Sequence, residues 1–371
     1  MSSLAPRRAR SVDPQLLGWA AFMLVGGILA LYSASAILAD KEHGDAFFYL
    51  KRQGLFAAAG TLVMAALMRV SYQRLREWIW LLLPLTALAL VAVLFAPKIG
   101  GARRWLHLGP FGLQPAEFAK LTVLLFLADY LDRKRSRLQN AVQGLVVPWG
   151  VVGLLLGLIL LEPDLGTPVL IFAVTLGVLF VGGARVRYVV GAVLAALPLA
   201  AWQLWAYPYR RARLLSFLDP FADASGTGYQ LSQSLLAVGS GGWFGKGPGL
   251  SDVKLLYLPA PHTDFIYPVL CEELGVLGGL SVLGLFAWFL SRGLSIARRA
   301  PDLYGTLLAA GVTFLVSLQA FFNMAMSLGL IPTKGLPLPF ISYGGSSLLV
   351  TMAATGILLN ISRHAAELPR R

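Results

Sequence analysis

Ten long stretches of predominantly apolar residues run through the chain and constrain its fold more than any other feature. A helix needs roughly 20 such residues to cross the hydrocarbon core of a bilayer. Because unpaired backbone groups are too costly inside lipid, stretches of this kind fold as helices. The sequence therefore predicts an all-α integral membrane protein with about ten transmembrane helices. The predicted spans are residues 15–38, 47–68, 78–97, 115–131, 142–161, 166–182, 188–206, 265–290, 304–329 and 343–361.

The composition agrees with this prediction, since 57% of the residues are hydrophobic, 13% are charged and the mean hydropathy is +0.70. These values leave no room for a sizeable soluble domain, so residues 1–371 are expected to form a single polytopic membrane domain. The first apolar stretch, Leu16 to Leu38, is longer than the h-region of about 7–15 residues in a signal peptide. We therefore expect it to be a span. The single cysteine, Cys271, excludes a disulfide framework and is expected to pack in the interior.

Basic residues orient the chain. Most of the 31 Lys and Arg residues lie in alternate connecting segments, which by the positive-inside rule places both termini in the cytoplasm. Cations on the opposite side need another explanation, and an anionic ligand at the outer surface provides one for the cluster. Solvation or phospholipid headgroups account equally well for any single member. The outer cations are Lys41, Lys51, Arg52, Lys98, Arg103, Arg104, Arg210, Arg211, Arg213, Lys246, Lys254 and Lys334.

The longest stretch outside the spans, residues 207–263, is predicted to be a large extracytoplasmic loop between the seventh and eighth spans. Within it, "GYQLSQSLLAVGSGG" is typical of a short amphipathic helix followed by a glycine turn. The run from Gly239 to Gly249 lacks the Walker spacing of a phosphate loop. Its glycines are expected to shape a tight turn, with Lys246 as a phosphate contact. Neither a nucleotide fold nor a nucleic-acid partner is expected.

The stretch "LPAPHTDFIYPVLCEELG" places Asp264 at the start of a predicted helix and two glutamates, Glu272 and Glu273, two turns inside it. A charge near hydrocarbon is costly and by default marks function. Partial desolvation raises the pKa of a carboxyl while nearby cations lower it, which suits Asp264 to act as a general base. His262 and Asp264 alone are too few for a metal site. A divalent cation, Mg²⁺ or Mn²⁺, that bridges phosphates to Asp264 is an alternative.

The stretch "GARRWLHLGPFGLQPAEFAKL" leads into the fourth span and carries several polar residues. Glu117 and Lys120 lie three positions apart, so they share a helix face and can pair. A structural ion pair and a functional lining of a cavity remain equally open at this point. The candidate substrate-binding residues of this stretch are Arg103, Arg104, Trp105, Gln114, Glu117 and Lys120.

Two further motifs lie at predicted helix junctions. In "LEPDLGT", Glu162 and Asp164 are expected to be water-exposed, with an aspartate that caps the next helix. In "IPTKGLPLPFISYGGSSLL", small residues allow close approach between helices, and a polar cavity wall is an equal alternative. Ser342, Tyr343 and Ser346 are the candidate substrate-binding residues there.

Four motifs occur in this order among the ten spans: "QPAEFAKL", "YRRARLLSFLDP" at the start of the 207–263 loop, "LPAPHTDFIYPVLCEELG" and "LPLPFISYGGSSLL". Together they resemble the SEDS family of cell-wall polymerases, whose members include FtsW and RodA. The resemblance covers nearly the whole chain. The stretch "YQLSQSLLAVGSGGWFGKGPGLSDVKLLYLP" is more similar to the FtsW branch, which acts at the division septum.

The resemblance implies a peptidoglycan glycosyltransferase on the outer face of the bacterial cytoplasmic (inner) membrane. Its substrates would be lipid II and a growing glycan on undecaprenyl pyrophosphate, and its reaction would invert the anomeric carbon. The HTDF motif supplies Asp264 as the catalytic residue, with His262 and Thr263 beside it. The QP-x-E-x-x-K motif supplies Glu117 and Lys120. One position departs from the family pattern, because Ala260 stands where a glutamate is common.

The same resemblance implies partners and a charge arrangement. A class B penicillin-binding protein, an FtsI-like transpeptidase, would be the crosslinking partner, alongside other membrane proteins of the division complex. Outer cations would stabilise the departing pyrophosphate while Asp264 accepts a proton. The candidate cations for this role are Arg103, Arg104, Arg213, Lys246 and Lys254.

Three alternatives remain open from the sequence. A lipid II flippase would place charge at the bilayer midplane and along one route, whereas the polar motifs here concentrate toward the outer face. A RodA-type elongation polymerase would share the chemistry but not the septal role. A non-catalytic scaffold of the division machinery would not need Asp264.

Overall fold

The structure is a computed structural model that describes residues 11–98, 102–109, 111–223, 226–252, 254 and 261–365. Helices account for most of these residues, which confirms the predicted all-α class. The helices are α1 (Pro14–His43), α2 (Phe48–Arg69), α3 (Leu75–Val93), α4 (Pro115–Arg133), α5 (Val147–Leu161), α6 (Gly166–Val181), α7 (Val186–Ala206), α8 (Pro208–Leu218), α9 (Tyr229–Ser240), α10 (Ile266–Arg299), α11 (Leu303–Ser327) and α12 (Gly345–Ser362). A short hairpin pairs β1 (Leu106–Leu108) with β2 (Phe111–Leu113).

The ten apolar stretches coincide with α1 to α7 and α10 to α12. Within the described ranges, seven helical segments are long and apolar enough to cross a membrane, and α6 is apolar but shorter. α2 and α4 carry more charge, since they contain Lys51 and Arg52, and Glu117 and Lys120. The largest difference from the prediction is at α10, which continues to Arg299 instead of ending near residue 290. Its last turn contains Arg298 and Arg299, which favour a helix C-terminus.

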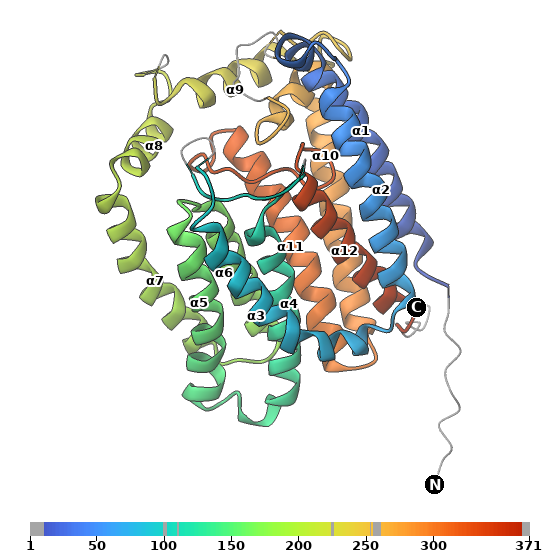
Figure 1. Ribbon diagram of the computed structural model, residues 1–371, viewed down its shortest axis with the longest axis vertical. Helices are drawn as coiled ribbons and strands as arrows, with labels where there is room; N and C mark the ends of the chain where they lie inside the picture. The colour runs from blue at the N-terminus through green and yellow to red at the C-terminus, as the bar shows by residue number, and fades with distance from the viewer. Residues whose placement is uncertain are drawn as a thin grey trace.

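Three helices form the interior of the bundle. Of an 18-residue apolar stretch in each helix, 89% is buried in α12 and 72% in α11, against 11% in α7. α4 lies beside both of them, α2 packs along α12, and α10 packs along α11 (Figure 1). α7 lies at the opposite edge from α1 and α2 and is the least enclosed of the spans (Figure 1). The interior of the bundle is therefore the place where buried polar groups must find partners.

Small residues bring these helices close together. A Cβ atom at Gly60 of α2 would lie 2.5 Å from the Met352 sulfur of α12, and one at Gly356 would lie 2.8 Å from the Met64 carbonyl oxygen. A Cβ atom at Gly345, in the "SYGGSS" run, would overlap the Phe56 ring. Close packing around glycine is a common basis of helix association in lipid. The expected close approach at "SYGGSS" is therefore present.

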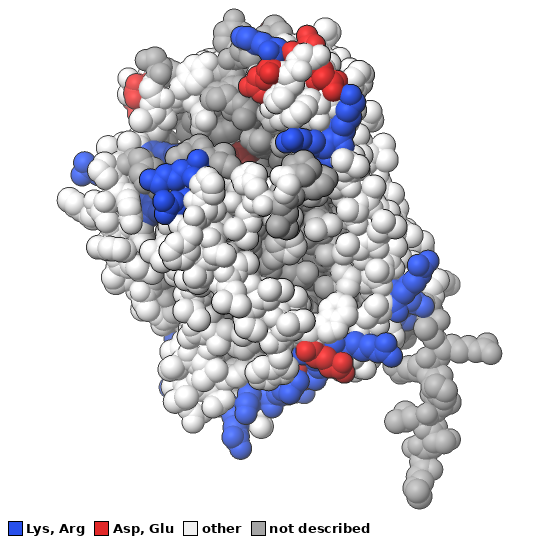
Figure 2. All heavy atoms as spheres, viewed as in Figure 1, with Lys and Arg blue, Asp and Glu red and all other residues white. Residues whose placement is uncertain are grey.

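Charged side chains gather at the two ends of the face drawn in Figure 2, with a wide uncharged band between them. The starts and ends of the bundle are also tied together. The Asp13 N–H donates to Ser362 Oγ at 3.1 Å, and Arg292 pairs with Asp13 at 2.7 Å. The first residues of α1 and the last of α12 thus lie at the same end of the molecule.

The opposite end carries the hairpin and the long segment between α7 and α10. α8 continues from α7 at the edge of the bundle, and α9 extends across this end (Figure 1). The predicted amphipathic helix is confirmed as α9, whereas α8 was not predicted. The predicted glycine turn follows α9 and contains left-handed backbone at Gly242, Gly245, Gly247 and Gly249.

Candidate functional site

Asp264 lies in a run of turns over residues 261–265, just before α10 begins at Ile266. The prediction that it starts the helix is therefore wrong by two positions. Dense surrounding protein desolvates its carboxylate and raises the pKa to about 6, although part of its surface remains accessible. The nearby carboxylates of Asp164 and Glu117 raise this pKa further, whereas Arg104 and Arg213 lower it. Asp264 thus lies where four other ionisable groups act on one carboxyl.

Two contacts fix the backbone around Asp264. The side-chain amide of Asn323, in α11, donates to the Asp264 carbonyl oxygen at 2.8 Å and to the Leu336 carbonyl oxygen at 2.7 Å. One amide therefore joins the turn before α10 to the segment that follows α11. That segment also comes close to the carboxylate, because a Cβ atom at Gly335 would lie 3.0 Å from Asp264 Oδ2.

The predicted pairing of Glu117 with Lys120 is present in α4. Lys120 Nζ lies 2.7 Å from Glu117 Oε1, and both side chains are almost fully buried. The same ammonium donates to Gln319 Oε1 at 2.8 Å, and the Gln319 amide donates to the Pro337 carbonyl oxygen at 2.8 Å. The pair thus supports the segment that contacts Asp264 and acts on its carboxyl through the charge of Glu117.

Two cations, Arg104 and Arg213, act on this carboxyl, and a third, Lys334, lies next to Gly335 in the chain. Arg104 donates from Nε to the Glu162 carbonyl oxygen at 3.1 Å and from its terminal nitrogen to the Pro163 carbonyl oxygen. Arg213, in α8, is exposed, and Lys334 precedes the Gly335 contact. Burial lowers the pKa of Lys334, while Asp164 raises it. Arg103 differs from these, since it is exposed and donates to the Leu94 carbonyl oxygen at 2.8 Å.

The acidic residues of "LEPDLGT" are not water-exposed as predicted, because Glu162 is 0% and Asp164 is 4% exposed. Asp164 accepts from the Gly166 N–H at 2.9 Å and the Thr167 hydroxyl at 2.8 Å, so it binds the start of α6 from one position before the N-cap residue, which is Leu165 and not the predicted aspartate. Neither Glu162 carboxylate oxygen has a hydrogen-bond partner among the described residues. Burial raises the pKa of Glu162 to about 8, which keeps it neutral at pH 7.

His262 packs in a group of aromatic rings. Its ring lies 4.3 Å from Tyr49 and 5.5 Å from Tyr343, between ring centroids, and its backbone carbonyl accepts from the Tyr343 N–H at 2.8 Å. Burial lowers the pKa of His262 to about 4, so the ring is neutral at pH 7. Thr263 is half-buried in the same turn. His262 thus belongs to an aromatic group with Tyr49 and Tyr343, two positions before Asp264 in the chain.

The remaining polar candidates hold backbone. Ser342 Oγ accepts from the Leu338 N–H at 2.8 Å, and Ser346 Oγ accepts from the Gln114 N–H at 3.1 Å. Trp105 packs on the hairpin, where a Cβ atom at Gly112 would lie 3.2 Å from its ring. These contacts connect the hairpin, the start of α4 and the start of α12.

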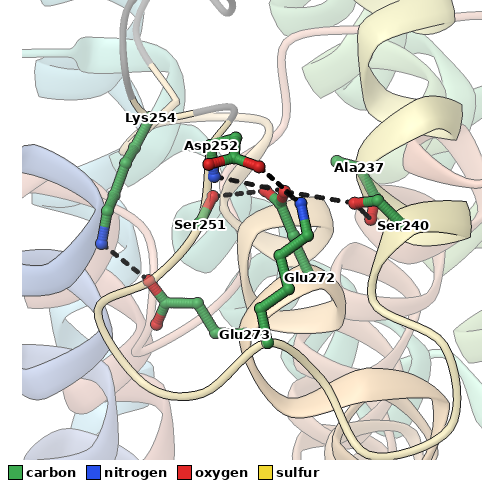
Figure 3. A network of polar contacts seen from close by, with 8 residues as sticks. Ala237, Ser240, Ser251, Asp252, Lys254, Glu272 and Glu273 are labelled. Carbon is green, nitrogen blue, oxygen red and sulfur yellow. Dashed lines mark hydrogen bonds and ion pairs between the residues drawn. The ribbon is translucent and has the colours of Figure 1, made fainter.

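Lys246 and Lys254 pair with the two glutamates of α10, and Figure 3 shows Lys254 beside Glu273. Lys246 Nζ lies 2.6 Å from Glu272 Oε1 and 2.7 Å from Asp252 Oδ2. Lys254 Nζ lies 3.0 Å from Glu273 Oε1, and both of these side chains are buried. Asp252 and Glu272 raise the pKa of Lys246, so it remains charged.

The side-chain set does not fit a resident metal ion. In the part of the chain that the structure describes, no group of three or more His, Cys, Asp or Glu residues could hold a metal. His262 is turned into an aromatic group and Asp164 is engaged at the start of α6.

Comparison with known proteins identifies the family. A family model described as "Cell cycle protein", whose label joins FtsW, RodA and SpoVE, matches residues 15–367. The chain belongs to this FtsW/RodA/SpoVE family. It is 42% identical to stage V sporulation protein E of Bacillus subtilis over 92% of this chain and 94% of that protein. It is 44% identical to a probable peptidoglycan glycosyltransferase FtsW of Nitrosococcus halophilus, over 94% and 92% of the two chains.

Solved structures of the family share the fold. A chain from a peptidoglycan synthase complex, studied for the coordination of polymerization and crosslinking, superposes with a TM-score of 0.79 at 31% identity, over 95% of this chain and 98% of that one. The rod shape determining protein RodA of Thermus thermophilus superposes with a TM-score of 0.71 at 29% identity, over 96% and 98%. The resemblance found in the sequence motifs is thereby confirmed.

Sequence reasoning missed several residues of this family member's site. Gln319 and Asn323 lie in the predicted span 304–329, whose polar residues were not singled out, and their signal was an amide at the buried face of a helix. Lys334 was counted among the outer cations but not placed at the site. The burial of Glu162 had no signal in the sequence, because a carboxylate beside a proline turn normally lies in water.

Proposed function

We propose that this member of the FtsW/RodA/SpoVE family is a peptidoglycan glycosyltransferase that polymerises lipid II at the outer face of the cytoplasmic membrane. Relatives that cover nearly the whole chain carry the name peptidoglycan glycosyltransferase FtsW. The observation that supports the activity best is the position of Asp264. It is a partly accessible carboxyl with a pKa of about 6, influenced by Arg104 and Arg213 and adjacent to the Gly335 backbone.

The proposed chemistry is direct displacement. The acceptor is a sugar hydroxyl of lipid II, and the donor is a glycan on undecaprenyl pyrophosphate. Asp264 takes the hydroxyl proton as the oxygen attacks the anomeric carbon, and the bond to pyrophosphate breaks with inversion. A base with a pKa near 6 is mostly ionised at pH 7 and still accepts a proton readily. Arg104, Arg213 and Lys334 offset the charge that develops on the departing pyrophosphate.

The proposed location follows from the positive-inside rule. All ten predicted spans would cross the membrane, both termini would be cytoplasmic, and the end with α8 and α9 would face outward. A crosslinking transpeptidase of the class B penicillin-binding type is the proposed partner. In support, one solved relative belongs to a complex of polymerization and crosslinking. The septal role is proposed from the FtsW-like stretch of residues 229–259, which begins with α9.

The test is polymerisation by the purified full-length protein, with and without the transpeptidase, with glycan products resolved on a gel. Asp264→Asn is expected to abolish product, because the amide cannot accept the proton. Asp45→Asn is the matched control, since this aspartate pairs with Lys51 at the surface and is not among the groups that shift the pKa of Asp264. Polymer from Asp264→Asn at the wild-type rate would refute the role of Asp264.

The same preparation separates the alternatives. Absence of polymer from the wild type under every partner condition, with lipid II crossing protein-containing vesicles, would replace the enzyme with a flippase. Absence of both activities, together with normal division in cells that carry Asp264→Asn, would support a scaffold.

A further inference from the structure

α10 is interrupted where the outer loop meets it. Gly275 has φ 71° and ψ −173°, a backbone conformation that is essentially restricted to glycine. At this break, Val276 and Leu277 do not donate to Glu272 and Glu273, four residues earlier, as they would in a regular helix. They donate to the Gly242 and Trp243 carbonyl oxygens, at 2.9 and 3.3 Å. The break in α10 thus provides two donors to the loop.

The loop in turn donates backbone hydrogen bonds to α10. The Lys246 N–H donates to the Glu272 carbonyl oxygen and the Gly247 N–H donates to the Glu273 carbonyl oxygen, both at 3.0 Å. Four of the groups freed by the break, the N–H groups of Val276 and Leu277 and the carbonyl groups of Glu272 and Glu273, therefore have partners in the loop. The fit is tight, because a Cβ atom at Gly245 or Gly275 would overlap backbone atoms across the contact.

Side chains reinforce the same contact (Figure 3). Glu272 accepts from Lys246 at 2.6 Å, from Ser240 at 3.1 Å and from the Ser251 hydroxyl. Glu273 accepts from Lys254 at 3.0 Å and from Ser33 of α1 at 2.6 Å. Both glutamates are more than nine-tenths buried, and their pairing explains how charges are accommodated inside this span. Each has a counter-ion from the loop.

The contact between the loop and α10 brackets Asp264 in the chain. The loop residue Lys254 and the helix residue Glu273 are 19 positions apart, and Asp264 lies between them. The ion pair therefore joins the two ends of the chain segment that contains the turn with Asp264. The first half of α10 follows that turn directly, and the glycine break with its inserted loop separates it from the second half.

We propose that Glu272 and Glu273 are positioning residues for glycosyl transfer, which hold the loop in the break of α10 and thereby fix Asp264. This inference rests on the proposed function. It assigns Lys246 and Lys254 as counter-ions of these glutamates, not as ligands of pyrophosphate.

Matched neutral variants separate the two roles of Lys254. Lys254→Met leaves the Glu273 carboxylate buried and unpaired, and is expected to lower kcat about 10- to 100-fold, as small misplacements of a reacting group do. KM for lipid II is expected to stay within about twofold. The double variant Lys254→Met with Glu273→Gln removes both charges and is expected to recover most of the activity. A lysine that binds pyrophosphate could not be rescued by neutralising a glutamate.

The single cysteine of the chain reports on the contact without any need for activity. Cys271 is buried in the first half of α10, and its carbonyl oxygen lies against Gly241 of the loop. Lys254→Met is expected to speed maleimide labelling of Cys271 at least about tenfold, and the double variant to restore slow labelling. Elution as a single folded species on size exclusion excludes simple misfolding.

Two results would overturn the proposal. One is wild-type kcat and wild-type Cys271 labelling in both Lys254→Met and Glu272→Gln. The other is a double variant as inactive as Lys254→Met, with a raised KM. If the wild type makes no polymer, the proposed function fails, whereas the labelling arm still decides whether these pairs hold the loop in α10.

Discussion

The buried pair between Glu117 and Lys120 gives the sharpest stability prediction. The side chains are 4% and 1% exposed, so neither charge is solvated. Lys120→Met keeps the length of the side chain but leaves the Glu117 carboxylate without its partner. Removing one member of a buried pair costs about 3–5 kcal/mol. We expect a loss of this size in the free energy of unfolding.

The double variant Glu117→Gln with Lys120→Met should be less damaged than Lys120→Met alone. No charge then remains in the interior, and replacement of a whole buried pair by neutral groups is often tolerated. The remaining loss comes from Gln319, whose Oε1 no longer has the lysine donor. An unsatisfied buried acceptor costs about 1–3 kcal/mol, so the double variant should lose that amount.

The assay is denaturant unfolding in detergent, followed by tryptophan fluorescence. Lys51→Met is the control, because its pair with Asp45 is on the surface and its side chain is 68% exposed. Surface pairs contribute about 0–1 kcal/mol, so this variant should unfold like the wild type. The reasoning would be refuted if the double variant lost as much free energy of unfolding as the single variants Lys120→Met and Glu117→Gln lose together. Such a result would mean that the two charges act independently.

Three further predictions concern the site. Polymerisation should rise with pH through about 6, because Asp264 must be ionised to accept a proton and its pKa is raised to about 6; a rate independent of pH between 5 and 7 would contradict this. Gly275→Ala should lower stability by at least about 1–3 kcal/mol from backbone strain alone, whereas Gly284→Ala, with open space at its Cβ, should not; equal unfolding midpoints would refute the break. Lys334→Met should lower kcat about 10²- to 10³-fold on gel assays, with a smaller loss in Lys334→Arg.

Much of the helical framework could be predicted from the sequence, because each span must satisfy its own backbone inside lipid. A long apolar run therefore has one dominant outcome, and the ten predicted stretches coincide with ten helices. The pairing of Glu117 with Lys120 followed from helical spacing in the same way. The position of Asp264 in the chain relative to α10 was also predicted to within two residues.

Features that depend on contacts between distant segments could not be predicted. Gly275 looks like any glycine in an apolar helix until the loop from Gly242 to Gly247 is placed against it. The two lysines of that region looked like free outer cations, because their glutamate partners lie on a different element. The burial of Glu162 likewise depends on the arrangement of neighbouring elements.

The polar residues inside the helices and those outside them have different tasks. Carbonyl oxygens of non-helical backbone inside or close to the bilayer need hydrogen-bond donors from the protein, since lipid offers none. Asn323 and Gln319 supply them, because their amides donate to the carbonyl oxygens of Asp264, Leu336 and Pro337. The backbone on both sides of the site is thus satisfied from α11, which leaves the Asp264 carboxylate available for chemistry. A site built in this way keeps its reactive group accessible while the segments that carry it remain fixed.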